Sequence, residues 1–454
     1  MNSSRPVESV AAALSTGSSA AADLARSLAI SQPTVSRALR ALIEAQRALR
    51  MGGPTHGARY ALRRVVDEIG SVWPLYRIDN RGVPQELGPL YAIERDSYFS
   101  GATAGHGHLK GTFEGLPYYL QDSRPGGFLG RAIPAAYPEL GLPPRVVDWT
   151  DVHVLVYLTR RGVDSVGDLV LGTEALDRYL AQAQTPRMIT IGERGVQYIA
   201  LAEGAMAGAA PGSSAQGEHP KFTICVAEGE RRTHMIVKFS PPRGTPIGQR
   251  WADLLIAEHI AHRVLQTGGI AACHSSIIDH GERIFLECER FDRFGLAGRR
   301  GAVSLFAVDT TRYGKLDNWS ASAGRLAADR LLTAEDAERI RVLDAFGALT
   351  ANTDRHFGNV TLFDRYAGPF ELAPAYDMLP MLFAPQSDQI VQRVFAPTPP
   401  TAAWLAVWPR AVTLAETYWD ALANEPTLST DFRALCTKSR QALNQLPRFG
   451  APKS

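Results

Sequence analysis

The chain has 454 residues, of which 45% are hydrophobic and 21% are charged, with a formal net charge of +2. This composition is ordinary for a globular protein, and the sequence holds neither a signal-peptide pattern nor an apolar run of membrane-spanning length. We therefore expect a cytoplasmic protein of about three structural units, at roughly 150 residues for each unit.

The first 64 residues carry most of the charge asymmetry. They contain nine arginines but only three acidic residues, Glu8, Asp23 and Glu44. Positive charge concentrated on one small module is the electrostatic signature of a nucleic-acid partner. The N-terminal part of the chain is therefore predicted to bind DNA.

Three short helices and a hairpin are predicted in this module. Residues 7–14 form an Ala-rich helical stretch, and in residues 19–28 two leucines at i, i+4 spacing share one face. After a short turn, Ser31 is a plausible N-cap for a third helix, whose Pro33 is tolerated in the first turn. Residues 47–64 then read as two basic strands around several glycines, which predicts a β-hairpin.

The third helix has the pattern of a recognition helix. Val35, Leu39 and Leu42 make an apolar stripe, which leaves its polar side chains on the opposite face. In a helix-turn-helix such side chains meet base edges, and flanking arginines meet phosphates. The predicted major-groove residues are Gln32, Thr34, Ser36 and Arg37, and the predicted phosphate contacts are Arg40, Arg59, Arg63 and Arg64. The alternative is a basic helical domain that packs on the rest of the chain or on a partner.

Residues 73–195 mix aromatic and aliphatic runs with Gly/Pro-rich loops and contain no catalytic motif. His106 and His108 could be metal ligands, but no carboxylate or cysteine lies near them in sequence, which favours exposed loop histidines. The four cysteines lack CxxC spacing, so small buried side chains are expected rather than disulfides or a zinc site; they are Cys225, Cys273, Cys288 and Cys436.

A β-rich stretch followed by a helical stretch is predicted downstream. Residues 204–217 are rich in Gly, Ala and Ser, and they lead into two strands at 221–229 and 233–242 instead of acting only as a linker. Helices are predicted at 251–266, at 334–353 and in the C-terminal tail. This order suits a two-lobed fold with its site in the cleft.

The strongest chemical motif is NTDRHFGNV at 352–360, followed by LAPAYDML at 372–379. Phosphoryl transfer needs a carboxylate to orient or deprotonate the nucleophile, and an Asn and a second Asp to hold magnesium. Asp354 and Asn359 have the D-x4-N spacing of a kinase catalytic loop, and Asp377 follows at a distance that suits a β-hairpin. The alternative is a polar turn after a helix, with Asp377 capping another element.

Two weaker features lie upstream. Lys238 stands in a strand with hydrophobic neighbours, where a lysine can contact nucleotide phosphates or can protect an edge strand from aggregation. Its position between the Gly/Ser loop and Asp354 favours the phosphate role. In FLECERFDRFG, residues 285–295, a strand runs into alternating charge, which is consistent with an adenine-binding hinge or with a solvated strand end.

The motifs SSAQGEHPKF, HMIVKF, ERFDR, NTDRHFGN and AYDML, in this order, resemble the HipA-like kinases of type II toxin–antitoxin systems. The fused N-terminal helices resemble the YjjJ branch of that family. The resemblance covers residues 73–445 and implies an α+β protein. Its expected parts are a winged helix-turn-helix at 1–68, a β-rich N-lobe with a phosphate loop at 69–290, and a helical C-lobe with the catalytic loop at 291–454.

The resemblance also assigns site residues, with ATP and Mg²⁺ as cofactors. It implies that Asp354 is the catalytic base and that Asn359 and Asp377 coordinate the metal. The residues it places at the nucleotide are Gln216, Gly217, Glu218, His219, Pro220, Lys221, Lys238, Glu289, Arg290, Phe291, His356 and Tyr376, with Glu289 to Phe291 as the adenine hinge.

The family's Ser-x-x-Gly-x-x-Pro-Lys phosphate loop matches Ser214, Gly217, Pro220 and Lys221. The resemblance implies that Ser214, or the adjacent Ser213, is autophosphorylated. A phosphoserine there would add a charge of about −1.5 to −2 beside the nucleotide phosphates and expel the loop. The chain departs from the family at 218–219, where Glu-His replaces a small residue and Gln.

The predicted function is therefore an ATP-dependent serine/threonine protein kinase toxin that carries its own operator-binding domain. Its substrate is expected to be a protein, by analogy a translation component, and a separate antitoxin and a homodimer are compatible with the family. Two alternatives stay open: a small-molecule kinase of the aminoglycoside phosphotransferase kind, and a transcriptional regulator whose kinase-like domain is inactive or senses a ligand.

Overall fold

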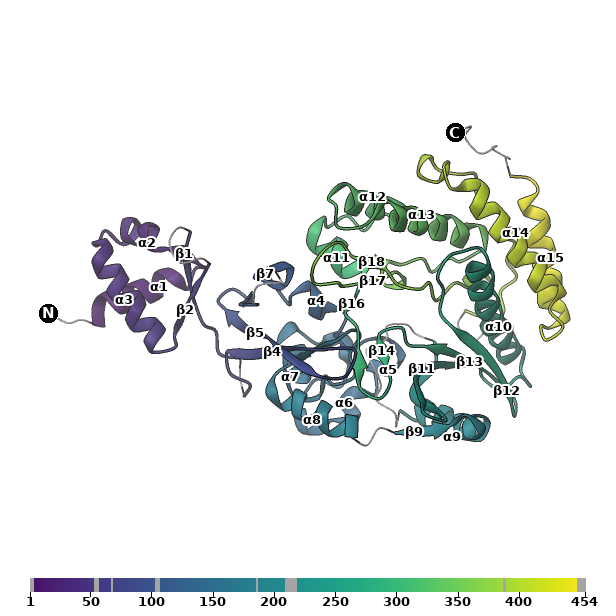
Figure 1. The fold of residues 1–454 in the computed structure, drawn as a ribbon, viewed down its shortest axis with the longest axis horizontal. Helices are drawn as coiled ribbons and strands as arrows, with labels where there is room; N and C mark the ends of the chain where they lie inside the picture. The colour runs from purple at the N-terminus through teal and green to yellow at the C-terminus, as the bar shows by residue number, and fades with distance from the viewer. Residues whose placement is uncertain are drawn as a thin grey trace.

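The computed structural model describes residues 4–52, 57–66, 68–102, 107–184, 187–208, 219–386 and 389–446. The chain forms a small N-terminal module at one end, two successive sheets with their helices, and a helical part at the other end (Figure 1). Within the described residues, no helix combines the length and the apolar composition that crossing a membrane requires.

The N-terminal module packs three helices against a three-stranded antiparallel sheet of order β1-β3-β2. Its core contains Val10, Leu24 and Leu39. Its elements are α1 (Ser4–Leu14), β1 (Ser19–Ala20), α2 (Ala21–Leu28), α3 (Gln32–Glu44), β2 (Ala48–Met51) and β3 (Arg59–Leu62). The predicted helices and hairpin are confirmed, except that Ser19–Ala20 pairs with β3 as a strand instead of starting the second helix.

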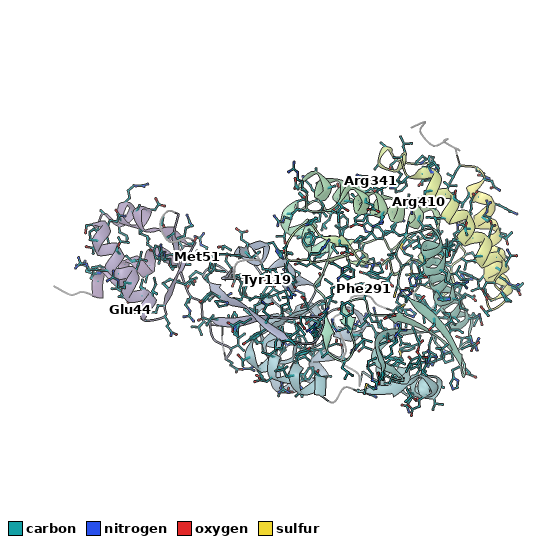
Figure 2. The ribbon with its side chains drawn as sticks, in the orientation of Figure 1. Glu44, Met51, Tyr119, Phe291, Arg341 and Arg410 are labelled. Atoms are coloured by element: carbon teal, nitrogen blue, oxygen red, sulfur yellow. The ribbon has the colours of Figure 1, made fainter. Side chains whose placement is uncertain are left out.

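Apolar side chains join this module to the next sheet. Leu49 and Met51 of β2 and Ala61 of β3 are buried in one cluster with Ile93 and Phe99. Met51 marks this junction in Figure 2. The hairpin therefore uses one face to hold the module on the rest of the chain.

Two predicted phosphate contacts lie at the same junction. The Arg63 guanidinium donates to Ser71 Oγ at 2.8 Å and lies 5.6 Å from the ring centroid of Tyr91. Arg64 donates to Tyr98 Oη at 3.1 Å. Both guanidinium groups thus form hydrogen bonds with residues in or next to the neighbouring sheet in this structure.

The middle of the chain forms a five-stranded antiparallel sheet of order β7-β6-β5-β4-β8. The strands are β4 (Val72–Ile78), β5 (Pro84–Ile93), β6 (Ser97–Ser100), β7 (Gly111–Glu114) and β8 (Leu169–Leu171). The helices are α4 (Tyr118–Gln121), α5 (Gly127–Gly130), α6 (Ile133–Ala136), α7 (Asp151–Arg161) and α8 (Thr173–Gln184). His108 Nε2 lies 2.8 Å from a carboxylate oxygen of Asp364, whereas His106 lies outside the described residues.

A second five-stranded sheet, of order β12-β13-β11-β10-β9, follows. It consists of β9 (Met188–Thr190), β10 (Lys221–Glu228), β11 (Arg231–Phe239), β12 (Ser275–His280) and β13 (Arg283–Glu289), with helices α9 (Arg194–Met206) and α10 (Pro246–Thr267). The predicted hairpin is confirmed, with Lys221 opposite Lys238. The stretch predicted as one N-lobe, residues 69–290, thus contains two separate sheets and a 22-residue helix.

The remaining elements build the helical part. A short ribbon, β14 (Arg293–Phe294) and β15 (Gly298–Arg299), leads into a sheet of β16 (Ala302–Ser304), β17 (Thr361–Phe363) and β18 (Glu371–Leu372). The helices are α11 (Leu305–Arg312), α12 (Trp319–Ala328), α13 (Ala334–Leu349), α14 (Trp408–Asn424) and α15 (Thr430–Leu443). Four of them begin with a capping side chain that accepts a backbone N–H, at Ser304, Asn318, Thr333 and Ser429.

The helices predicted at 251–266, at 334–353 and in the C-terminal tail are confirmed as α10, α13, α14 and α15. The four cysteines are all buried and free, as predicted.

A buried carboxylate ties the middle part to the helical part. Asp122, 8% exposed, accepts from the backbone N–H and the hydroxyl of Ser304, the residue that caps α11. We expect Asp122→Ala to lower the free energy of unfolding by about 3 kcal/mol, since each buried donor left unsatisfied costs about 1–3 kcal/mol. Urea unfolding measures this change. Asp148→Ala, which removes an exposed ion pair with Arg145, is the control and should cost less than about 1 kcal/mol.

Candidate active site

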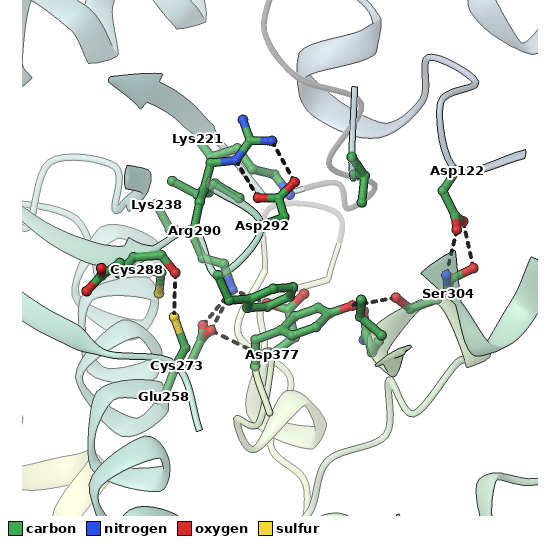
Figure 3. A pocket seen from close by; sticks show the side chains of 18 residues that line it. Asp122, Lys221, Lys238, Glu258, Cys273, Cys288, Arg290, Asp292, Ser304 and Asp377 are labelled. Carbon is green, nitrogen blue, oxygen red and sulfur yellow. Dashed lines mark hydrogen bonds and ion pairs between the residues drawn. The ribbon is translucent and has the colours of Figure 1, made fainter. Parts of the chain in front are cut away.

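A cavity lies where the second sheet meets the loop after α13 and the segment after β18 (Figure 3). It gathers eight of the residues predicted from the sequence: Lys221, Lys238, Glu289, Arg290, Phe291, Asn359, Tyr376 and Asp377. Four predicted residues do not line it, namely Asp354, His356, His219 and Pro220. Five more predictions, Ser213, Ser214, Gln216, Gly217 and Glu218, lie outside the described residues.

Lys238 is the electrostatic centre of the cavity. Its Nζ donates to both carboxylate oxygens of Glu258, at 2.7 and 2.8 Å, and forms an ion pair with Asp377. Strand alternation explains its direction, because Val237 and Phe239 on either side fill the apolar core of the sheet. Glu258 is fully buried on α10, so the long helix brings a carboxylate to the strand lysine.

Lys238, Glu258 and Asp377 shift one another's pKa values. Burial alone would lower the pKa of Lys238, but Asp377 and Glu258 outweigh burial and raise it. Burial raises the pKa of Glu258 in spite of the attraction of Lys238. At Asp377 burial is opposed by Lys238 and then Lys221, which together lower its pKa to about 2. Asp377 is therefore ionised and Lys238 protonated at neutral pH.

Asp377 is held in an uncommon backbone conformation. Its φ is 54°, in the left-handed region, which costs a non-glycine residue of order 1–3 kcal/mol. Its N–H donates to Glu258 Oε1 at 3.2 Å, and its carbonyl accepts from Asn352 Nδ2 at 3.2 Å. These contacts fix the carboxylate in the cavity.

Asn352 also shapes the predicted catalytic loop. Its Oδ1 accepts from the backbone N–H of Asp354 at 3.0 Å, and the Asp354 carbonyl accepts from Asn359 Nδ2 at 2.9 Å. The main chain of Asp354 is thus held on both sides. The side chain of Asp354 is exposed, and among the described residues its carboxylate has no hydrogen-bond or ion-pair partner.

The arrangement fits a magnesium ion. Asn359 is buried on a short 3-10 turn (Phe357–Asn359), and since its Nδ2 donates to Asp354, its Oδ1 is left as a ligand beside the Asp377 carboxylate. Mg²⁺ prefers oxygen ligands and is usually held by one or two protein groups with phosphates and water. The described residues contain no cluster of three or more His, Cys, Asp or Glu residues suited to a metal, so such an ion would depend on bound phosphate.

Two further predicted residues, His356 and Tyr376, form hydrogen bonds that support the loop. His356 Nδ1 accepts from the Gly358 N–H at 3.1 Å and so caps the turn. The Tyr376 hydroxyl donates to the Gly358 carbonyl at 2.8 Å while its ring lines the cavity. His219, predicted at the phosphates, packs on Trp251 with the ring centroids 4.6 Å apart.

The predicted hinge has much of its backbone already engaged. The N–H groups of Glu289 and Arg290 donate to the carbonyls of His274 and His234, at 2.9 and 2.8 Å. The Arg290 guanidinium is buried in ion pairs with Asp164 and Asp292. The N–H groups of Glu289 and Arg290 are therefore already used within the protein in this structure.

Sequence reasoning missed Glu258 and Asn352. Glu258 had a detectable signal, because it and His262 stand four residues apart on the predicted helix among apolar residues, and a buried charge needs a partner. Asn352 lies inside the recognised motif, yet its connecting role depends on Asp377, which is distant in sequence.

Comparisons with known proteins identify relatives of this chain. A family model for the YjjJ-like toxin middle domain matches residues 69–180, and one for the HipA-like C-terminal domain matches residues 213–440. Toxin YjjJ of Escherichia coli (strain K12) is 35% identical over 437 residues, which are 95% of this chain and 96% of that protein.

Solved structures give a more distant likeness. HipA of Shewanella oneidensis MR-1, in a complex with HipB and its operator DNA, matches with a TM-score of 0.50 and 14% identity over 82% of this chain and 95% of that one. The Helicobacter pylori proinflammatory kinase CtkA matches with a TM-score of 0.34 and 14% identity, over 49% of this chain and 90% of that one.

The HipA likeness shows a shared fold and carries no more than that. The family itself follows from the YjjJ identity along nearly the whole chain and from the two family models. This chain belongs to the YjjJ-like family of HipA-like toxins.

Proposed function

We propose that this toxin is an ATP-dependent serine/threonine protein kinase. The observation that carries the proposal is the convergence of Lys238, Glu258, Asn359 and Asp377 in one cavity. A strand lysine paired with a helix glutamate, an amide and a metal-binding carboxylate are the groups that position nucleotide phosphates in kinases. Bound Mg²⁺ supplies neutralisation of the phosphate charge.

Residues of this chain would bind the phosphates, hold the metal and accept the proton of the attacking hydroxyl. Lys238 would keep Glu258 as its partner and could donate its third hydrogen to a phosphate oxygen, and the Asp377 carboxylate would hold the metal. Asp354 accepts the proton of the attacking hydroxyl, because its carboxylate is exposed and unpaired on a fixed main chain. A serine or threonine of a protein substrate can reach an exposed carboxylate of this kind.

Autophosphorylation at Ser213 or Ser214 forms part of the proposal. It is supported by the phosphate-loop spacing, which ends at Pro220 and Lys221. Lys221 is buried beside the ionised site, where burial lowers its pKa to about 8. A phosphoserine near these cations would compete with the nucleotide for the same charges.

The test is phosphate transfer from labelled ATP with Mg²⁺ to the purified full-length chain, compared with Asp377→Asn. We expect label in the wild type only, on serine by phosphoamino-acid analysis and on Ser213 or Ser214 by mass spectrometry. Calorimetry on phosphatase-treated protein measures ATP binding separately. Absence of both label and ATP binding would contradict the kinase and leave the regulator whose kinase-like domain is inactive.

We also propose that residues 1–68 form a winged helix-turn-helix that binds operator DNA. Support comes from the order of α1, α2, α3 and the β2–β3 hairpin, and from the exposed polar face of α3. Of the predicted contacts, Gln32, Ser36, Arg37, Arg40 and Arg59 are exposed and Thr34 is half-buried. HipA, which shares this fold, is in a complex with HipB and its operator DNA, so a DNA partner and a separate antitoxin are compatible with the proposal.

Arg37→Ala is expected to weaken DNA binding at least tenfold, because the guanidinium stands on the exposed face of the predicted recognition helix. A base contact of this kind is worth about 1–3 kcal/mol. The measurement is fluorescence anisotropy with duplexes selected from a random-sequence library. Arg26→Ala removes the same charge from α2, where Arg26 pairs with Asp23, and should leave affinity within about threefold. Equal losses in both variants would mean that α3 has no special role.

A further inference from the structure

A second cavity, of about 530 Å³, lies beside the hairpin that carries Lys238, and residues from both faces of that hairpin line it. Phe222, Ile224 and Met235 line it, whereas Lys221 and Lys238 line the candidate active site. Strand alternation places these two sets on opposite faces of β10 and β11. The volume falls in the range of small-molecule sites, about 300–1,000 Å³.

The lining of this second cavity is strongly cationic. It includes five arginines and one carboxylate, Asp164. Arg290 and Arg293 are neutralised by Asp164 and Asp292, at N–O distances between 2.7 and 3.3 Å. Arg161 is neutralised by Glu139 and Glu174, each at 2.7 Å. Two of the five arginines, Arg187 and Arg299, therefore remain without a carboxylate among the described residues.

Arg299 is as buried as Arg290 and Arg293, at 6% exposed, but unlike them it forms no ion pair with a described carboxylate. Its Nη2 donates to the Val163 carbonyl and its guanidinium carbon lies 4.6 Å from the ring centroid of Tyr179. Its Nη1 has no hydrogen-bond partner within the described part of the chain. Burial and the neighbouring Arg293 lower the pKa of Arg299 to about 9. Asp164 opposes this shift but forms no ion pair with Arg299, so an anion in the cavity would add the close counter-charge that this buried cation lacks.

Arg187 provides a second cation at the same cavity. It is exposed and lines the cavity from the segment before β9, and no described carboxylate pairs with it. Guanidinium groups match phosphate oxygens with two parallel hydrogen bonds, and two such groups balance the charge of about −2 on a phosphate monoester.

The rest of the wall suits an organic body. Leu129, Leu201, Phe222 and Met235 contribute apolar surface, and Tyr157 adds an aromatic face. A bare inorganic anion would leave most of this surface uncovered. The cavity is thus built for a molecule that is anionic at one end and apolar or aromatic at the other.

We propose that this cavity binds a small organic phosphate, a phosphate monoester on an aromatic or apolar body, with Arg299 and Arg187 holding the phosphate. The site is separate from the nucleotide site, although Arg290 lines both cavities. Binding of an organic phosphate at this cavity therefore does not require the kinase activity.

The test is calorimetric titration of the full-length protein with phenyl phosphate. We expect one site per chain and an affinity loss of at least tenfold in both Arg299→Met and Arg187→Ala. Arg178→Ala removes an exposed arginine that pairs with Glu174 outside the lining and should bind as the wild type does. Phenol should not bind, and inorganic phosphate should bind at least tenfold more weakly than phenyl phosphate.

Two measurements separate this site from the active site and from misfolding. Phenyl phosphate should bind Asp377→Asn as it binds the wild type, and an ATP analogue should not displace it. Thermal unfolding should show that Arg299→Met is folded and unfolds cooperatively, since removal of a buried cation offsets the lost hydrogen bond to the Val163 carbonyl. No binding, binding that both arginine variants retain, displacement by the ATP analogue, or equal affinity for inorganic phosphate would overturn the proposal.

Discussion

Replacing Lys238 with methionine is expected to cost about 3–5 kcal/mol of unfolding free energy, because Glu258 then remains in the interior without its cation. Methionine keeps the apolar stem of lysine and removes the charge. The same change should abolish phosphate transfer, since Lys238 is proposed to hold the nucleotide phosphates. Urea unfolding and transfer from labelled ATP measure the two effects separately.

The double variant Lys238→Met/Glu258→Gln separates the effect on unfolding free energy from the effect on phosphate transfer. Glutamine removes the buried charge, so the double variant should regain most of the lost stability while phosphate transfer stays absent. Glu258→Gln alone is the matched single change that completes the cycle. If Lys238→Met is as stable as the wild type, the buried pair makes no net contribution. If the double variant transfers phosphate, Lys238 does not hold the nucleotide.

Asp354→Ala is expected to reduce phosphate transfer by about 10²–10⁴-fold, the usual contribution of a general base. Its unfolding free energy and its affinity for ATP should match the wild type, since the carboxylate is exposed and does not line the cavity. The main-chain bonds to Asn352 and Asn359 survive the change. Initial rates with labelled ATP and calorimetry give the two quantities.

Glu338→Ala is the control for Asp354→Ala. It removes an exposed carboxylate from α13, the helix that leads into the same loop, and should leave the rate within about twofold. A decrease of less than tenfold in Asp354→Ala would show that Asp354 is not the base. A large loss of ATP affinity in Asp354→Ala would instead place its carboxylate at the metal.

Most secondary structure was predictable because the governing interactions are local. The stripe of Val35, Leu39 and Leu42 defines α3, and alternating apolar residues define β10 and β11. The order of Asp354, Asn359 and Asp377 was readable because the first two share one loop and Asp377 follows the short β17–β18 hairpin that comes after it. Lys238 was placed on its strand for the same reason.

The partners of these residues depend on how distant elements meet. Periodicity tells which face of a helix is buried, but it does not tell which charge on another element that face will meet. Glu258 thus became visible as the partner of Lys238 only when α10 was seen packed on β11. Likewise, Arg63 and Arg64 read as part of a basic DNA-binding module, yet the neighbouring sheet engages both.

The sequence by itself therefore determined the helices and hairpin of the N-terminal module, the β10–β11 hairpin, the later helices and most residue types of the candidate active site, because these follow from short-range pattern. Only the tertiary structure decided the division of residues 69–290 into two sheets, the buried ion pair of Lys238 and the cationic cavity around Arg299. The physical reason is that burial, and with it the strength of every charge interaction, is set by contacts between segments far apart in the chain.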